Sequence, residues 1–287
     1  MTAIPPVRRR IVGTALRRYR QELGYTLEDA ARVLDCDRSK ISRIETGQRS
    51  IRPKELRELL TEYGADSQAQ EVLAMIADTR RAQGWWQPYP NVLPDASRDY
   101  FALEMAASQI LVFSGQQVPD LLQTNEYVTA VAEATPGVSL EEFRQLVDVC
   151  LVRQEVVLTE SRSEVAVVIG EAALRQAVGG NEVMHAQLAS LADVSSKFPK
   201  VSIQVLPFAR GAHAAGAAGS FTVLRYPEAP DLGVVHLPGV AGGAFLEGRE
   251  SVTAYTTSFV QLQASALTPT ASIRLIRQIH ADSLMSA

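Results

Sequence analysis

The sequence predicts an all-α N-terminal domain of five helices, followed by an α/β or α+β domain with a small sheet of about four strands and flanking helices. Three observations lead to this expectation. The chain has 287 residues, about twice the length of an ordinary single domain. Apolar residues recur at helical spacing up to residue 83, and after residue 160 short β-branched runs alternate with helical patterns. We therefore expect one helical domain and one domain that contains a sheet.

The first two helices are separated by a glycine. Gly24 can supply the C-terminal cap of a first helix in which four apolar residues recur at helical spacing. These residues are Ile11, Ala15, Leu16 and Tyr19. Thr26 can act as the N-cap of the second helix, with Asp29 three positions on completing a capping box. The inward face of this second helix is expected to hold Leu27, Ala30, Ala31 and Leu34.

The remaining helices of this domain are also bounded by capping residues. Asp37 is placed as the N-cap of a third helix, and Gly47 ends it. Ile41 and Ile44 give this helix an inward face. Pro53 is suited to the first turn of a fourth helix, which continues through Leu56, Leu59 and Leu60. Residues 68–83 are expected to form the fifth helix.

A change in composition marks the boundary between the domains. Residues 84–94 read GWWQPYPNVLP, with three prolines and two adjacent tryptophans. We place the N-terminal domain at residues 1–83, a hinge at 84–96 and the second domain at 97–287. Trp85 and Trp86 could stack on nucleic-acid bases, but in a proline-rich junction such residues more often pin one domain against the other.

The second domain is expected to combine helices with a few strands. Residues 97–160 are mostly helical by their apolar spacing. Short β-branched runs then predict strands. The predicted strands are residues 164–170, 201–206, 220–226 and 232–237, and the predicted helices are 171–178, 181–196, 250–264 and 268–284.

The composition excludes several classes of protein. Hydrophobic residues make up 46% and charged residues 21%, as in a folded soluble protein. No run approaches the roughly 20 apolar residues of a membrane-spanning helix, and the N-terminus lacks the pattern of a secretory signal, so we expect a cytoplasmic location. Only Cys36 and Cys150 are present, far apart, which excludes a disulfide framework and a cysteine-rich metal site. Both are expected to be reduced thiols.

The net charge of −4 hides an asymmetry between the two parts of the chain. Residues 1–65 carry a net charge of +5, with 14 Lys and Arg against 9 Asp and Glu. Residues 66–287 carry a net charge of −9, with 14 basic against 23 acidic residues. A basic module attached to an acidic body is typical of a domain that meets phosphates, although basic surfaces also occur without a nucleic-acid partner.

Residues 26–53 carry the pattern of a DNA-binding motif. Two short helices joined by a turn bring the second one out at a steep angle, so that its N-terminal end can enter a major groove. With Ile41 and Ile44 inward, the outward positions of this helix hold donors suited to base edges and phosphates. They are Arg38, Ser39, Ser42 and Arg43, with Lys40 near the rim. Arg49 and Arg52, just past the helix, are placed to contact flanking phosphates, and double-stranded DNA is the expected partner.

This segment resembles the helix-turn-helix of the xenobiotic-response-element family, which includes the phage Cro and C1 repressors. The resemblance covers roughly residues 8–65 and is carried by Thr26-Leu27, Ala30-Ala31, Leu34, the run SKISRIE at residues 39–45, and Gly47. It implies that Glu45 pairs with Arg20 in a structural role. Many relatives carry a phosphate-contacting glutamine in place of Leu27, so Thr26, the backbone beside Glu28 or Arg32 is expected to make that contact here.

Residues 97–285 resemble the C-terminal domain of unknown function of actinobacterial WhiJ-type regulators. The similar segments include VPDLLQTNEYVTAV, GEAALRQAVGG, VSIQVLPF and GAHAAGAAGSFTVL, whereas Pro119-Asp120 departs from the usual Pro-Gly. The resemblance implies a DNA-binding transcriptional regulator that often works with a small partner protein, in an arrangement likened to a toxin and antitoxin pair. The alternatives are an antitoxin-like protein that sequesters a small partner and a small-molecule-sensing regulator. A homodimer is expected, because one short helix reads too few base pairs for discrimination in a genome.

No pattern in the second domain indicates catalysis. The four histidines, His185, His213, His236 and His280, lie on different predicted elements without metal-ligand spacing. There is no Ser-His-Asp order or phosphate loop, and VAGGAF at residues 240–245 lacks the strand-to-helix context of a nucleotide loop. We therefore expect no enzymatic activity, no catalytic or metal-binding residues and no cofactor.

A polar pocket at the edge of the sheet is one expectation for the second domain. Glu171 follows an apolar strand, and Arg153, Gln154 and Gln187 lie on neighbouring helices, where α/β proteins commonly bind ligands or partners. Alternatively, Glu171 complements the dipole in the first turn of its own helix. Residues 209–220 are small and nearly uncharged, and they could form a lid, a docking loop or a plain mobile connection.

Overall fold

The N-terminal part of the chain folds into consecutive short helices. The computed structural model describes residues 5–77, 84–89, 92–134, 139–226, 232–239 and 243–285. Residues 5–77 hold five helices, which confirms the all-α expectation. They are α1 (Val7–Glu22), α2 (Leu27–Val33), α3 (Arg38–Glu45), α4 (Pro53–Glu62) and α5 (Ser67–Ala77). The part of the expected fifth helix at 78–83 lies outside the described residues.

Local sequence signals account for the ends of these helices. The Thr26 hydroxyl accepts from the Asp29 backbone N–H, and the Asp29 carboxylate accepts from the Thr26 N–H at 2.7 Å, so the predicted capping box is present. Gly24 and Gly47 have φ angles of 69° and 72° after α1 and α3. This left-handed conformation suits glycine, which is why the helices end there.

The second domain is built on a mixed sheet. The described residues hold six strands in the order β3-β2-β1-β4-β5-β6. Their bounds are β1 (Gln109–Ser114), β2 (Glu164–Gly170), β3 (Val201–Leu206), β4 (Phe221–Arg225), β5 (Gly233–Leu237) and β6 (Ala244–Glu247). The first three strands are parallel, and β4 pairs antiparallel with β1 and β5, with Phe113 opposite Phe221. The antiparallel pair β5–β6 forms the other edge, with His236 opposite Phe245.

The sheet has more strands than the sequence predicted, because β1 and β6 were missed. Residues 109–114 were included in a helical region, but they form the central strand β1. Ile110 and Val112 point to one face and Leu111 and Phe113 to the other, and all four are buried. A strand covered on both faces shows no apolar and polar alternation, so a short apolar run of this kind cannot be told from a buried helix by periodicity.

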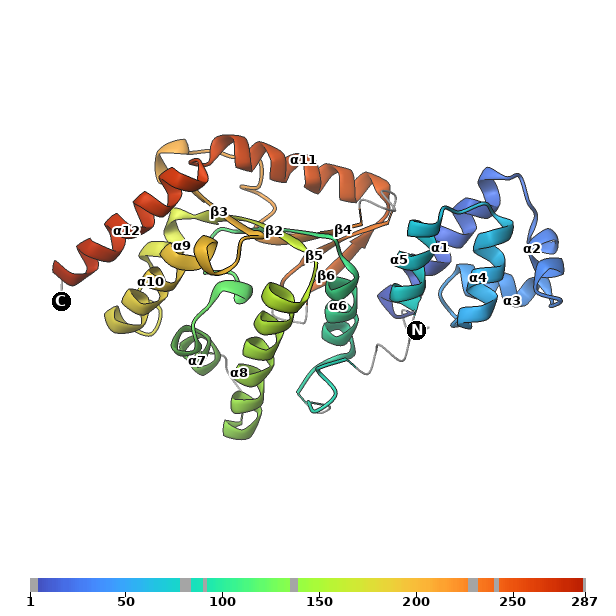
Figure 1. The fold of residues 1–287 in the computed structure, drawn as a ribbon, viewed down its shortest axis with the longest axis horizontal. Coiled ribbons are helices and arrows are strands. Elements are labelled where there is room, and N and C mark those ends of the chain that lie inside the picture. Colours follow the sequence, from blue (N-terminus) through green and yellow to red (C-terminus); the bar gives the residue numbers. More distant parts are fainter. Residues whose placement is uncertain are drawn as a thin grey trace.

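Helices cover both faces of the sheet (Figure 1). One face packs against α11 (Arg249–Ser265) through Phe259 and Leu262. The helices on the other side and at the β3 edge are α6 (Asp95–Ala106), α7 (Asn125–Glu133), α8 (Leu140–Glu155), α9 (Glu171–Arg175), α10 (Asn181–Lys197) and α12 (Pro269–Met285). Short helical turns occur at Asp120–Leu122, Val156–Glu160 and Phe208–Arg210. None of the helices in the described ranges has the length and apolar character needed to cross a membrane.

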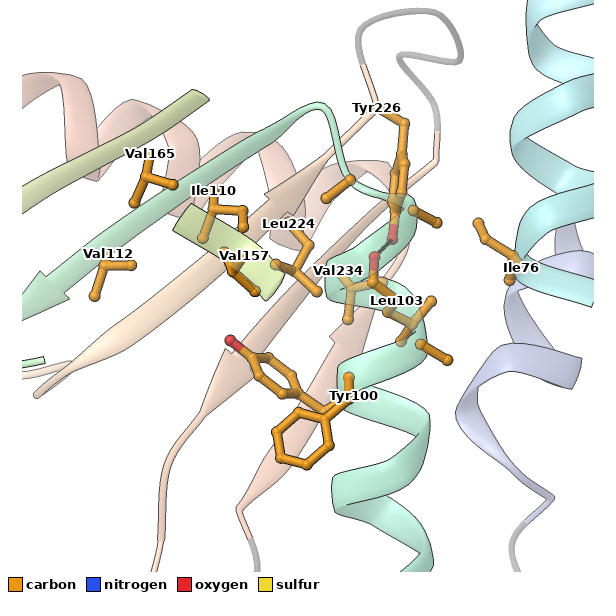
Figure 2. Packing of buried hydrophobic residues seen from close by; sticks show 14 of the residues in the cluster. Ile76, Tyr100, Leu103, Ile110, Val112, Val157, Val165, Leu224, Tyr226 and Val234 are labelled. Carbon is orange, nitrogen blue, oxygen red and sulfur yellow. Dashed lines mark hydrogen bonds between the residues drawn. The ribbon is translucent and has the colours of Figure 1, made fainter. Parts of the chain in front are cut away.

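The core under α6 joins the helix to the central strands (Figure 2). Ile110, Leu224 and Val234 are fully buried there. The Tyr226 hydroxyl donates to the Leu103 carbonyl at 2.9 Å, which satisfies a polar group inside this core. The position of α6 on the sheet is therefore fixed by both apolar packing and a buried hydrogen bond.

The two domains meet along α1, α5 and α6. Arg8 of α1 donates to Asp99 of α6 at 2.8 Å, and Arg10 Nε donates to Glu247 of β6 at 3.0 Å. Trp86 is 2% exposed and lies 5.9 Å from the Phe101 ring of α6. This burial supports the interpretation of Trp86 as a packing residue at the junction and leaves its ring unavailable for stacking on bases.

Candidate nucleic-acid interface

The second helix of the motif, α3, divides cleanly into an inward and an outward face. Ile41 and Ile44 are 1% and 2% exposed and belong to the core of the N-terminal domain. Arg38, Ser39 and Arg43 are exposed, and Ser42 is partly buried. The apolar pair therefore anchors the helix, while hydroxyl and guanidinium donors remain on its outer side.

The two arginines on this face are held only by weak local contacts. Arg38 Nη1 lies 2.9 Å from Glu28 of α2, with both side chains more than half exposed. Arg43 Nε donates to the backbone carbonyl of Ser39 at 3.2 Å. The Arg38 hydrogen bond lowers the pKa of the Glu28 carboxyl. Because exposed ion pairs contribute little free energy, both guanidinium groups can exchange these contacts for a phosphate or a base at small cost.

Lys40 has a different environment from its neighbours on α3. Its ammonium lies 2.7 Å from the Glu55 carboxylate of α4, and both side chains are less than one fifth exposed. The Glu55 carboxylate also accepts from the Arg52 backbone N–H. Lys40 therefore joins α3 to the start of α4. The sequence placed Lys40 near the rim of the DNA-contacting face and did not reveal this ion pair.

Thr26, predicted as a phosphate contact, has its hydroxyl engaged in the cap of α2. The hydroxyl donates to Asp29 Oδ2 at 2.7 Å and accepts from the Asp29 backbone N–H at 3.1 Å. Thr26 is nevertheless exposed at the surface. Its local role is to start the helix that leads into the turn before α3.

Arg49 and Arg52 follow α3 in the connection to α4. Both are exposed and form no ion pair with any residue that the structure describes. Arg49 also lines a cavity of about 270 Å³ between the domains, together with Arg8 and Asp99. Two exposed positive charges thus flank the C-terminal end of α3, one of them beside the junction with the second domain.

A buried ion pair fixes the angle between α1 and α3. Arg20 Nε and Nη2 donate to the two oxygens of Glu45 at 2.7 and 2.9 Å, and Arg20 Nη1 donates to the Tyr25 carbonyl at 2.6 Å. Both side chains are less than one tenth exposed. Gly13 lies at the same crossing, where an added Cβ would come 2.5 Å from the Ile44 carbonyl oxygen. The buried ion pair and the close packing at Gly13 therefore fix the position of α3 against α1.

The polar residues predicted to share a pocket in the second domain do not line one together. Arg153, Gln154 and Gln187 each hold the segment at residues 120–124. Arg153 Nη1 lies 3.5 Å from Asp120, Gln154 donates to the Gln123 carbonyl at 3.0 Å, and Gln187 donates to the Leu122 carbonyl at 2.8 Å. Glu171 instead accepts from the Phe208 N–H at 2.9 Å and pairs with Arg175. These side chains thus contact the backbone groups of two different turns, and their role in binding a ligand or partner stays a prediction.

The four histidines lie on different elements, as predicted. The rings of His185 on α10 and His280 on α12 stack with centroids 3.8 Å apart, because these two helices pack together. The described residues contain no group of three or more potential metal ligands. In the loop at residues 209–220, Ala215 is 1% exposed and the His213 ring lies against Phe113, whereas most of the other residues are exposed. Residues 240–242 lie outside the described residues, and 244–247 form β6.

The cysteines are both free thiols. Burial raises the pKa of Cys150 to about 12 and also raises the pKa of Cys36. A thiol must lose its proton to act as a nucleophile or metal ligand. Neither cysteine is therefore prepared for such chemistry by its surroundings.

Comparison with known families assigns both parts of the chain. A family model described as a domain of unknown function (DUF5753) matches residues 97–278. The chain belongs to the DUF5753 family. A second model, described as a helix-turn-helix domain, matches residues 11–73, which include most of α1, all of α2 to α4 and most of α5. Comparison with curated proteins and with solved structures gives no match. In this DUF5753 protein, the helix-turn-helix domain thus precedes the family domain.

Proposed function

We propose that this DUF5753 protein is a sequence-specific, DNA-binding transcriptional regulator of the Cro and C1 repressor type. The observation that carries the proposal is the outer face of α3. Arg38, Ser39 and Arg43 are exposed on a helix whose other side is locked into the core by Ile41 and Ile44. A helix anchored on one face, with several exposed donors on the other, is the arrangement that reads base edges in a major groove.

In this mechanism residues 38–43 of α3 enter the major groove. Arg43 lies one turn after Ser39 and can engage a guanine through two hydrogen bonds, while the serine hydroxyls adapt to either donor or acceptor groups. Arg38 would leave Glu28 to reach DNA, at the small cost of an exposed ion pair. Lys40 stays with Glu55 and acts by holding α3 on α4.

Phosphate contacts would set the register of the helix on the duplex. Arg49 and Arg52 are exposed beside the end of α3 and carry the charge needed for this role. The exposed start of α2, with Thr26 as its cap, faces outward on the same motif. The positive charge of residues 1–65 supports approach to DNA.

Recognition of a natural operator would require two copies of the chain. One α3 touches only a few base pairs, which is too little information to select a site in a genome. Two copies related by a two-fold axis would read half-sites one helical turn apart. Light scattering of the protein with and without a palindromic duplex tests this, and binding of a single copy per operator would contradict it.

The acidic charge of the second domain favours a second candidate function, in which it binds a small partner protein. Residues 97–287 carry a net charge of −7, with 12 Lys and Arg against 19 Asp and Glu, and the resemblance to the WhiJ-type regulators implies such a partner. The chain would then act as the DNA-binding, antitoxin-like member of the pair. Co-purification from the native host tests this: a stoichiometric small protein supports it, and a homo-oligomer free of other chains counts against it.

Selection from a pool of random duplexes tests the DNA-binding proposal. The full-length protein should enrich a defined sequence, and Arg43→Ala should weaken binding of that sequence by about 1–3 kcal/mol while relaxing the preference at one base position. Arg144→Ala removes the same charge from an exposed position on α8 and serves as the control. An Arg43→Ala protein with the affinity and preference of the wild type would contradict the assigned role of α3.

A further inference from the structure

The second domain contains a cavity that the helix-turn-helix does not explain. Its volume is about 490 Å³, within the range of small-molecule sites in proteins. It opens at the carboxyl end of β1, between α6, α8 and the ends of β4 and β5. The neighbouring strand β2 runs parallel to β1, whereas β4 runs antiparallel to it. Open α/β sheets commonly bind ligands at such an edge, outside the carboxyl ends of parallel strands.

Aromatic rings form the wall of this cavity below α6. Tyr100 and Phe101 come from α6, and His236 comes from β5 with its ring 4.6 Å from that of Tyr100. Figure 2 shows the Tyr100 ring extending from α6 beneath the sheet. Burial lowers the pKa of His236 to about 4, so this ring is neutral at pH 7. The wall therefore offers flat, uncharged surfaces on which another planar ring can stack.

The charges around the cavity do not cancel. Arg153 donates to both oxygens of Glu104 at 2.8 and 2.7 Å, and this pair is buried behind the Tyr100 hydroxyl. The Asp120 carboxylate also lies near this guanidinium, 3.5 Å from Arg153 Nη1, and the Asp120 side chain is 67% exposed. Two carboxylates and one guanidinium leave an excess negative charge at Asp120, which favours a positively charged group.

We propose that this cavity binds a small aromatic amine, with its ring against Tyr100 and His236 and its ammonium group beside Asp120. The ring would take the place of water on the apolar wall, and the ammonium would complete the charge balance at the rim. An anion of the same shape would meet the surplus carboxylate and bind more weakly. The site is independent of the α3 face and lies wholly within the second domain.

Elements at the cavity also contact the N-terminal domain, so binding of a ligand in the cavity would affect that domain. On α6, Ser97 and Tyr100 line the cavity, while Asp99 accepts from Arg8 of α1. On the neighbouring hairpin, His236 lies 5.0 Å from the Phe245 ring of β6, and Glu247 of the same strand accepts from Arg10 of α1. The first of these ion pairs starts from α6, which lines the cavity, and the second starts from β6, which lies beside the cavity-lining residue His236.

The position of Arg49 extends this connection to the DNA-binding face. Arg49 lines the 270 Å³ cavity between the domains with Asp95 and Asp99 of α6. A ligand that shifts α6 changes the negative charges beside an arginine assigned to phosphate contact. This regulatory step rests on the proposed DNA-binding function, whereas the ligand site does not.

Isothermal titration calorimetry of the full-length protein tests the site with three probes of the same size. Tryptamine, tryptophol and indole-3-acetate share a ring and a two-carbon side chain but are positive, neutral and negative. We expect tryptamine to bind most tightly and indole-3-acetate least. Asp120→Asn should weaken the affinity for tryptamine about three- to fivefold, as expected for the loss of a single exposed charge pair. The affinity for tryptophol should stay unchanged. Absence of tryptamine binding, or equal affinity for the three probes, would overturn the proposal.

Two tryptophan substitutions locate the binding in the cavity. Ser97→Trp places a large side chain at the cavity wall and should abolish binding of tryptamine, whereas Ser195→Trp adds the same side chain at an exposed position on α10 and should not. Binding that survives Ser97→Trp and Asp120→Asn alike would place the ligand elsewhere. Asp120→Asn keeps the shape of the side chain, so the site remains testable if Ser97→Trp does not fold.

The regulatory step is tested by repeating the DNA titration with saturating tryptamine. Operator affinity of the wild type should change at least threefold, and Asp99→Asn should bind tryptamine normally but lose this change. Tryptamine binding without any effect on DNA affinity would overturn the connection through α6. If no duplex is bound at all, the DNA-binding function fails, while calorimetry still decides on the cavity.

Discussion

At the scale of single residues, Glu45 shows why the type of side chain on α3 does not by itself define the interface. A carboxylate on a recognition helix would repel phosphates if it faced them. Glu45 is 8% exposed and turns inward to Arg20. The pair removes a negative charge from the outer face of α3, which we propose contacts DNA, and ties α3 to α1 at the same time. Its spacing in the sequence offers no sign of contact, and only the family resemblance implied it.

Removal of Arg20 should destabilise the N-terminal domain. Arg20→Ala leaves the Glu45 carboxylate buried without a partner, which typically costs about 3–5 kcal/mol. Hydrogen exchange of the amides in α1 to α3 should therefore be much faster than in the wild type. Arg17→Ala, at an exposed position on the same helix, is the control and should exchange as the wild type does. Equal protection in the Arg20→Ala protein would refute the supporting role of this pair.

The neutral state of His236 predicts a dependence of stability on pH. Burial and the nearby Arg153 lower the pKa of His236 to about 4. In an unfolded chain the pKa of a histidine is about 6.5. As pH falls from about 6.5 to 4, the unfolded state takes up the proton first, so the contribution of His236 to stability is full above pH 6.5 and lost toward pH 4. The loss should be about 1–3 kcal/mol.

Urea denaturation at several pH values measures this effect, with the fluorescence of Trp85 and Trp86 reporting on the region around α6. His236→Phe keeps a ring between Tyr100 and Phe245 but cannot take up a proton. The difference in unfolding free energy between the two proteins should be constant above pH 7 and change below pH 6. Parallel curves over the whole range would show that His236 is not held neutral.

At the scale of elements, the sequence predicted best where a helix end or an amphipathic face has a local cause. The cap of α2, the proline at the start of α4 and the strands β2 and β3 each follow from a few neighbouring residues. The strand β1 was missed because it is buried on both faces. The cavity was missed with it, since Tyr100, Asp120 and His236 are far apart in sequence and meet only through the position of this strand.

Gly13 is an element-scale feature whose importance only the packing reveals. In an ordinary helix, Gly→Ala stabilises by up to about 1 kcal/mol. Here the added Cβ would lie 2.5 and 2.6 Å from the carbonyl oxygens of Ile44 and Glu45. Gly13→Ala should instead destabilise the α1–α3 crossing by about 1–3 kcal/mol and weaken DNA binding, because α3 must move outward.

Thermal unfolding followed by far-ultraviolet circular dichroism tests whether Gly13→Ala lowers the stability of the protein instead of raising it. Thr14→Ala, at the next and exposed position of α1, should leave the unfolding temperature unchanged or raise it slightly. A Gly13→Ala protein that is as stable as Thr14→Ala would mean that α1 and α3 are not in close contact in solution.

At the scale of the whole molecule, the chain joins a basic helix-turn-helix domain to an acidic DUF5753 domain through ion pairs on α1. The same arginine-rich helix that supports α3 is therefore also the element held by α6 and β6. The proposed coupling between the cavity of the second domain and α3 would act through this helix. It also shows why net charge alone was uninformative, since the total of −4 conceals a positive domain.

The most direct test of the account is a fluorescence anisotropy titration of the full-length protein against its selected duplex and a scrambled duplex at two salt concentrations. We predict tight binding of the selected duplex, with a preference over the scrambled one that persists when salt weakens both complexes. Weak binding to both duplexes that disappears at the higher salt concentration would contradict sequence-specific recognition by α3 and leave the helix-turn-helix as an accessory to the DUF5753 domain.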